Sequence, residues 1–141
     1  MACLDKDRRM QMLDFVNPKI IAAIQILAAL GIAGFWMTWL RTEHNEPWLP
    51  TGYVEHERCF VYPDSVLAVL MVVSAIVLIL ENALGERLAL VCGGMMLFLL
   101  VIDTAYFLRN GMFAKEKGGA GNLGLIVVLI IVSLLMILRF L

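Results

Sequence analysis

Residues 20–40 have the sequence IIAAIQILAALGIAGFWMTWL, and none of these 21 side chains is charged. A helix rises about 1.5 Å per residue, so this run matches the roughly 30 Å hydrocarbon core of a bilayer. Asn17-Pro18 precedes it and is typical of a helix start, because proline at the first helical position loses no hydrogen bond. The run is longer than the apolar core of a cleavable signal peptide, about 7–15 residues, and therefore predicts a retained membrane-spanning helix.

Three further apolar runs follow and predict membrane-spanning helices at 65–82, 87–109 and 122–141. They are far longer than β-strands, although the second is rich in β-branched residues. Polar segments separate the runs: an extramembrane loop at 41–63, a short turn near 81–87 and a Gly-rich loop at 110–121. With an N-terminal tail at 1–18, residues 1–141 form a single membrane domain. We therefore expect an all-α integral membrane protein, a four-transmembrane-helix antiparallel bundle with one long loop between helices 1 and 2.

The composition supports a bilayer as the surrounding solvent. The chain has 141 residues, of which 62% are hydrophobic and 16% charged, against roughly 45–50% and about 25% in soluble domains. So short a chain has too little interior to hide that much apolar surface. A net charge of −1 argues against a nucleic-acid partner. Cys3, Cys59 and Cys92 lie far apart without a CxxC pair, which argues against a disulfide framework.

A few polar residues in or near the predicted helices are candidates for function. Asp103 lies six residues before Arg109, about 9 Å inside the helix end, where a carboxylate is costly unless it faces the bundle or water. Tyr106 shares its helix face, and Asp64 is placed to cap the second helix. In an antiparallel bundle the first and third loops share one side, so these three residues and the loop residues His56 and Glu57 form a candidate polar vestibule. A purely structural role for Asp64 and Asp103 stays open.

The long loop carries other possible metal ligands, but no metal-binding spacing. His44, Glu55, His56, Glu57 and Cys59 match neither CxxC nor HExxH. Alternating charges of this kind are typical of a solvated loop. Both histidines lie in the loop, whereas a transmembrane cytochrome needs haem ligands inside its helices. We therefore predict no metal, no cofactor and no catalytic residue.

Small residues in two of the predicted helices suggest close helix packing. Gly31 and Gly34 lie in the first helix, and Gly93 and Gly94 in the third. Such residues let helix backbones approach closely in membranes, either within one chain or between protomers. Gln25, about one turn inside the first helix, is expected to form a hydrogen bond between helices.

Orientation is weakly encoded in the positions of lysine and arginine. Six lie on the side of the tails and the second loop, and five on the opposite side. The positive-inside rule then predicts cytoplasmic N- and C-termini, with the basic tail before the first helix carrying most of the signal.

Two classes of function are compatible with these features. The first is a small non-enzymatic membrane protein, either an auxiliary subunit of a larger membrane complex or a homo-oligomer; its partners are the lipid bilayer and other membrane subunits or further copies of itself. The alternative is a small transporter or channel for an ion, a proton or a small metabolite that uses Asp103 and Asp64. A membrane-embedded enzyme using the same carboxylates is a third and weaker interpretation.

Overall fold

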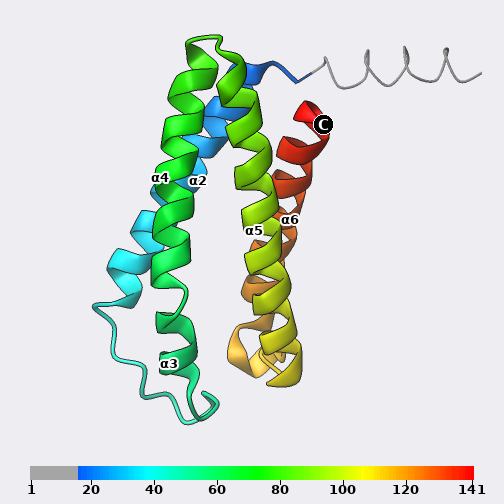
Figure 1. The fold of residues 1–141 in the computed structure, drawn as a ribbon. Helices are drawn as coiled ribbons and strands as arrows, with labels where there is room; N and C mark the ends of the chain where they lie inside the picture. Colours follow the sequence, from blue (N-terminus) through cyan, green and yellow to red (C-terminus); the bar gives the residue numbers. More distant parts are fainter. Residues whose placement is uncertain (1–15) are drawn as a thin grey trace, which may run out of the picture.

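The structure is a computed structural model that describes residues 16–141. The N-terminal tail before Val16, with three of the six basic residues on the side predicted to be cytoplasmic, lies outside the described residues. The elements, all helical in this part of the chain, are α2 (Pro18–Trp39), α3 (Tyr53–Arg58), α4 (Val61–Ile79), α5 (Ala83–Arg109), the short 3₁₀ helix η1 (Lys115–Lys117) and α6 (Gly119–Phe140). The four long helices alternate in direction (Figure 1).

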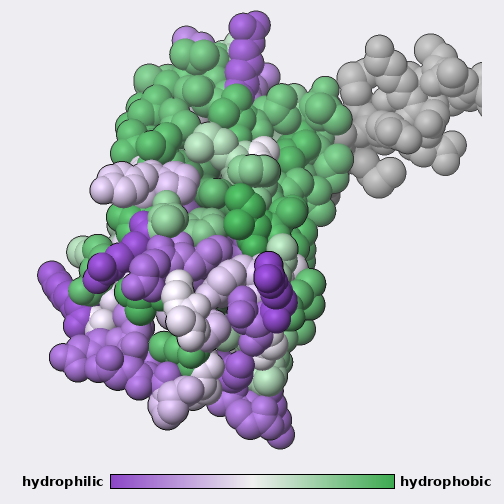
Figure 2. Space-filling model, turned by 60° about the horizontal axis from the view of Figure 1, so that its bottom comes forward, coloured by the Kyte–Doolittle hydropathy of each residue, from purple (hydrophilic) through white to green (hydrophobic). Residues whose placement is uncertain are grey.

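Four helical stretches are long and apolar enough to cross a membrane. They are α2, the α3–α4 stretch Tyr53–Ile79, α5 and α6. In the 18-residue apolar segment of each stretch, at most 28% of the residues are buried within the chain. Most of these apolar residues therefore face outward. Figure 2 shows an apolar band over the helices, with polar residues gathered at the end that carries the loops. The prediction of four helices of membrane-spanning length and composition is confirmed.

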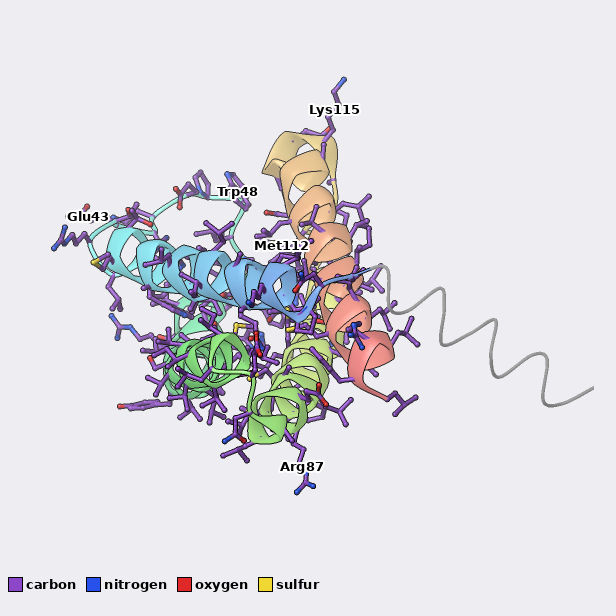
Figure 3. The ribbon with its side chains drawn as sticks, turned by 90° about the horizontal axis from the view of Figure 1, so that it is seen from above. Glu43, Trp48, Arg87, Met112 and Lys115 are labelled. Carbon is purple, nitrogen blue, oxygen red and sulfur yellow. The ribbon has the colours of Figure 1, made fainter. Side chains whose placement is uncertain are left out.

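The helices contact one another in chain order. α2 packs on α4, α4 on α5, and α5 on α6. Seen along the bundle, α2 and α6 diverge from each other toward the loop end (Figure 3). At the opposite end Arg139 Nε donates a hydrogen bond to Val16 O at 2.8 Å. One buried apolar core joins the four long helices and includes Ile21, Ala22, Met71, Ala75, Ala89, Cys92 and Met136.

The first two long helices begin in different ways. α2 starts as predicted, with Pro18 as its first residue and the Asn17 side chain accepting a hydrogen bond from Lys19 N. α4 begins at Val61 rather than residue 65, and Asp64 is not its cap, so both of those predictions are wrong. The physical reason lies in Pro63. Its missing N–H costs nothing anywhere in the first turn, so proline did not have to mark the start.

The connections after α4 are tighter than predicted. A turn at Leu80–Asn82 contains Glu81 with φ 56°, and Asn82 caps α5 by accepting a hydrogen bond from Leu84 N at 2.9 Å. α5 therefore starts at Ala83, not at 87. α6 starts at Gly119 rather than 122, because η1 and a left-handed Gly118 shorten the Gly-rich loop.

Among the glycines predicted to pack closely, Gly93 does so within the chain. A Cβ there would lie 2.9 Å from Ile137 Cγ1 and 3.0 Å from Ser133 O of α6. A Cβ at Gly31, Gly34 or Gly94 would meet nothing within 4 Å. At these three positions no other part of the described chain comes close. The other alternative, packing between protomers, stays a prediction for them.

Candidate functional site

Two acidic residues lie in line with the buried residues of α4 and α5. On α4 Asp64 lies three residues before the buried Leu67, and on α5 Asp103 lies three residues after the buried Leu100. Residues three or four apart share a helix face, so both carboxyl groups lie on the inward faces of α4 and α5.

A third acid is buried by a helix that the sequence pattern did not predict. Gly52, with φ 81°, precedes α3, and this short helix turns Glu57 inward. Glu57 is only 7% exposed. The prediction of a solvated loop across 41–63 is therefore wrong at this point. Tyr53, Glu57 and Phe60 recur at helical spacing, a short signal that alternating charges around it obscured.

Glu57, Asp64 and Asp103 form what we call the acidic cluster. The Glu57 carboxyl group interacts electrostatically with those of Asp64 and Asp103, and Asp64 and Asp103 interact with each other. Within residues 16–141 the one ion pair that joins side chains is Lys19–Glu81, at the opposite end of the bundle. The cluster thus gathers acidic groups in a largely buried place where, within residues 16–141, none of them forms an ion pair with a lysine or arginine, an arrangement that is expensive if all three groups are ionised.

Hydrogen bonding satisfies the cluster only in part. Trp36 Nε1 donates to Asp64 Oδ2 at 2.9 Å. Glu57 Oε1 and Asp103 Oδ1 are buried without a hydrogen-bond partner. Leaving a buried polar atom unpaired costs about 1–3 kcal/mol, and such atoms in a native fold call for a functional or ligand-based explanation. Trp36, which nothing in the sequence marked as part of the site, is its one hydrogen-bond donor from α2.

His56 and Tyr106 complete the predicted vestibule in an unexpected way. Their rings stack with centroids 3.7 Å apart and an interplanar angle of 9°. Tyr106 interacts electrostatically with Glu57, but it forms no hydrogen bond with Asp103, where the shared helix face had suggested one. All five residues of the candidate vestibule lie in one region of the structure. Their role in binding stays a prediction.

A pocket in the neighbouring loop lies near Glu57 without being lined by it. Its volume is about 260 Å³, and His44, Glu46, Gly52 and Tyr53 are among its lining residues. Tyr53 and Glu57 lie four residues apart on α3 and interact electrostatically, so this pocket ends one helical turn from the acidic cluster. Nearby, Trp36, Trp39 and Phe60 form a buried aromatic group.

The acidic cluster does not resemble a metal centre. In the described part of the chain no group of three or more His, Cys, Asp or Glu side chains is arranged to hold a metal ion. The three carboxyl groups are close enough to influence one another, yet they do not converge as ligands around a common point.

No protein-family model matches the chain, and neither a curated protein nor a solved structure shows significant similarity to it.

Proposed function

We propose that this protein is a small membrane transporter that moves protons, alone or coupled to a solute, through the acidic cluster. The proposal is carried by one observation, the burial of Glu57 without a hydrogen-bond partner. Its side chain is 7% exposed, and its Oε1 has no hydrogen-bond partner beside two further carboxyl groups. A buried acid without a partner is expensive to keep, and acids inside membrane proteins are found mainly on ion and proton pathways.

The ionised and the protonated states of the acidic cluster differ in free energy. Three ionised carboxylates without a basic partner repel one another in a medium that screens charge poorly. One bound proton removes a charge and turns one carboxylate into a hydrogen-bond donor for another. Trp36 stabilises a charge on Asp64 through its N–H group, which favours Glu57 and Asp103 as the sites that take up and release the proton.

The proposal is tested by proton flux in liposomes that contain the purified protein. An imposed pH gradient should collapse faster than in protein-free liposomes, with the potential clamped by K⁺ and valinomycin. Asp103→Asn should slow the collapse by several-fold, roughly 1 kcal/mol in barrier height, since one proton site is lost. Glu116→Gln, an exposed acid at the same end of the bundle, should leave the rate unchanged. Equal rates with and without protein would contradict the proposal.

A role as an auxiliary subunit or homo-oligomer is the second proposal, and one observation supports it. α2 packs mainly on α4 and α6 mainly on α5, and a Cβ at Gly31 or Gly34 would meet nothing within 4 Å. Small residues on an open helix face allow another helix to approach closely. Native mass spectrometry in mild detergent should then show a defined multimer or a co-purifying subunit. A clean monomer that retains proton flux would contradict this proposal and leave the first intact.

A further inference from the structure

Polar groups that the proposed function does not use lie inside the bundle and in the long loop. Inside the bundle Gln25 Nε2 donates to Ser74 Oγ at 3.1 Å, which confirms the hydrogen bond between helices predicted for Gln25. The long loop contains the pocket of about 260 Å³, which opens to water at the polar end of the molecule (Figure 2). Four of its lining residues carry a carboxyl group or a ring: His44, Glu46, Tyr53 and Glu55.

Backbone hydrogen bonds hold the walls of this pocket in place. Leu49 N donates to Glu46 O at 3.0 Å, and Tyr53 N donates to Pro50 O at 3.1 Å. Gly52, with φ 81°, then turns the chain into α3. The loop segment and the first turn of α3 are therefore joined without the help of a ligand. A site that is formed in advance loses little conformational entropy when it binds.

The two rings of the pocket are fixed against a buried tryptophan. The His44 ring stacks on that of Trp39 with centroids 4.3 Å apart, and its Nε2 donates to Trp39 O at 3.0 Å. A carbonyl oxygen only accepts, so Nε2 carries the hydrogen and Nδ1 of the neutral ring is left as an acceptor. Tyr53 packs on the same aromatic group and meets the His44 ring edge-on at 6.3 Å. A tyrosine ring attracts cations within about 6 Å of its centre.

The charged groups of the pocket are all acidic. Glu46 and Glu55 line it and are exposed, and no lysine or arginine of the described chain is among its lining residues. Neither carboxyl group takes part in the one ion pair within residues 16–141. Glu43 differs from them, because it lies outside the pocket and accepts a hydrogen bond from Asn45 Nδ2 at 3.2 Å. Two carboxylates without a basic partner favour a positively charged ligand.

Size and composition narrow the class of cation. The volume of about 260 Å³ lies just below the roughly 300–1,000 Å³ of sites for drug-sized molecules, so the ligand is small. No group of three or more metal-binding side chains occurs in residues 16–141, whereas a bare metal ion such as Ca²⁺ needs several oxygen ligands at once. Leu49 and Val54 add apolar contacts beside the Tyr53 ring. This combination suits an ammonium group on a short hydrocarbon body.

We infer that the loop pocket is a binding site for a small organic cation, with the ammonium group at the carboxylates of Glu46 and Glu55 and the hydrocarbon body against the ring of Tyr53. The site is separate from the acidic cluster, because Glu57 does not line it. The inference therefore goes beyond the proposed function, and the cation binds whether or not the protein moves protons.

Isothermal titration calorimetry of the full chain in lipid nanodiscs tests the site, with phenylethylammonium chloride as the probe. Nanodiscs without protein measure the heat of partition into lipid. 2-Phenylethanol has the same hydrocarbon body without the charge and should bind about tenfold more weakly, since it loses both charged contacts. Glu46→Gln and Glu55→Gln should each weaken binding of the cation about two- to fivefold, as expected for exposed ion pairs. Both side chains are exposed, so neither change should disturb folding.

Glu43→Gln is the matched control, because it removes the same charge from the same loop outside the pocket. Its affinity for phenylethylammonium should equal that of the unchanged protein. Tyr53→Leu should weaken binding, and Tyr53→Phe, which keeps the ring, should restore it. Heat no greater than that of empty nanodiscs, equally tight binding of 2-phenylethanol, or equal losses in Glu43→Gln and Glu46→Gln would overturn the site. Each of these results leaves the proton-flux proposal intact, whereas cation binding by a protein without flux would support the site and refute that proposal.

Discussion

Replacing Glu57 by Met should reduce proton flux by about tenfold or more and should at the same time stabilise the protein. Flux falls because the most deeply buried proton site is lost. Stability rises because Met has nearly the same length and removes a buried oxygen that has no partner; apolar replacement of buried charged groups is often stabilising by about 1–4 kcal/mol. Flux in liposomes and reversible unfolding in mixed micelles measure the two effects.

The opposite signs of the two effects make Glu57→Met decisive. A residue that only supports the fold would lose stability and flux together. Glu116→Met provides the control, since Glu116 is exposed on η1 at the same end of the bundle; we expect unchanged flux and a change in unfolding free energy within about 0.5 kcal/mol. If the Glu57→Met variant showed the same flux as the unchanged protein, a proton-carrying role for this residue would be refuted.

Gly85→Ala should cost about 2 kcal/mol of unfolding free energy, the typical penalty for overpacking a core. An added Cβ would lie 2.6 Å from Leu78 N and 2.9 Å from Val77 C, and both are backbone atoms of α4 that cannot swing aside. The tight Leu80–Asn82 turn holds the two helices together at this point, so the strain must separate α4 from α5. Titration with a denaturing detergent, followed by tryptophan fluorescence, measures the loss.

Gly94→Ala is the matched variant on the same helix. No heavy atom lies within 4 Å of a Cβ at Gly94, and alanine favours a helix over glycine by about 1 kcal/mol in water. We expect this variant to be as stable as the unchanged protein or slightly more stable. If Gly85→Ala and Gly94→Ala lost similar amounts of unfolding free energy, α4 would not lie as close to Gly85 as the structure has it.

Much of the architecture was predictable from local sequence. A helix of about 20 apolar residues spans a bilayer whatever its neighbours are, so run length alone identified four such helices. Pro18 and Asn17 marked the start of α2 because helix caps depend on adjacent residues only. Asp103 stood out for its distance from Arg109, and the structure places it on the inward face of α5.

Other features depended on contacts between distant segments. Asp64 was expected to cap its own helix, yet its oxygen accepts a hydrogen bond from Trp36, 28 residues away. Glu57 was expected in the long loop beside Asp64 and Asp103, but the sequence did not predict the helix α3 that buries it. Neither feature is encoded near the residue itself, because each arises from where α2, α3 and α5 meet.

The glycines show why an apolar sequence leaves such contacts undetermined. Gly93 packs against α6 and Gly85 against α4, whereas the adjacent Gly94 faces open space. In water, alternation of polar and apolar residues marks the buried face of a helix. In these helices both faces are apolar, since lipid and protein interior are similar solvents, and the pattern is lost. Chain length and hydropathy therefore decided how many helices form, while side-chain fit in three dimensions decided which faces meet and which acids are brought together.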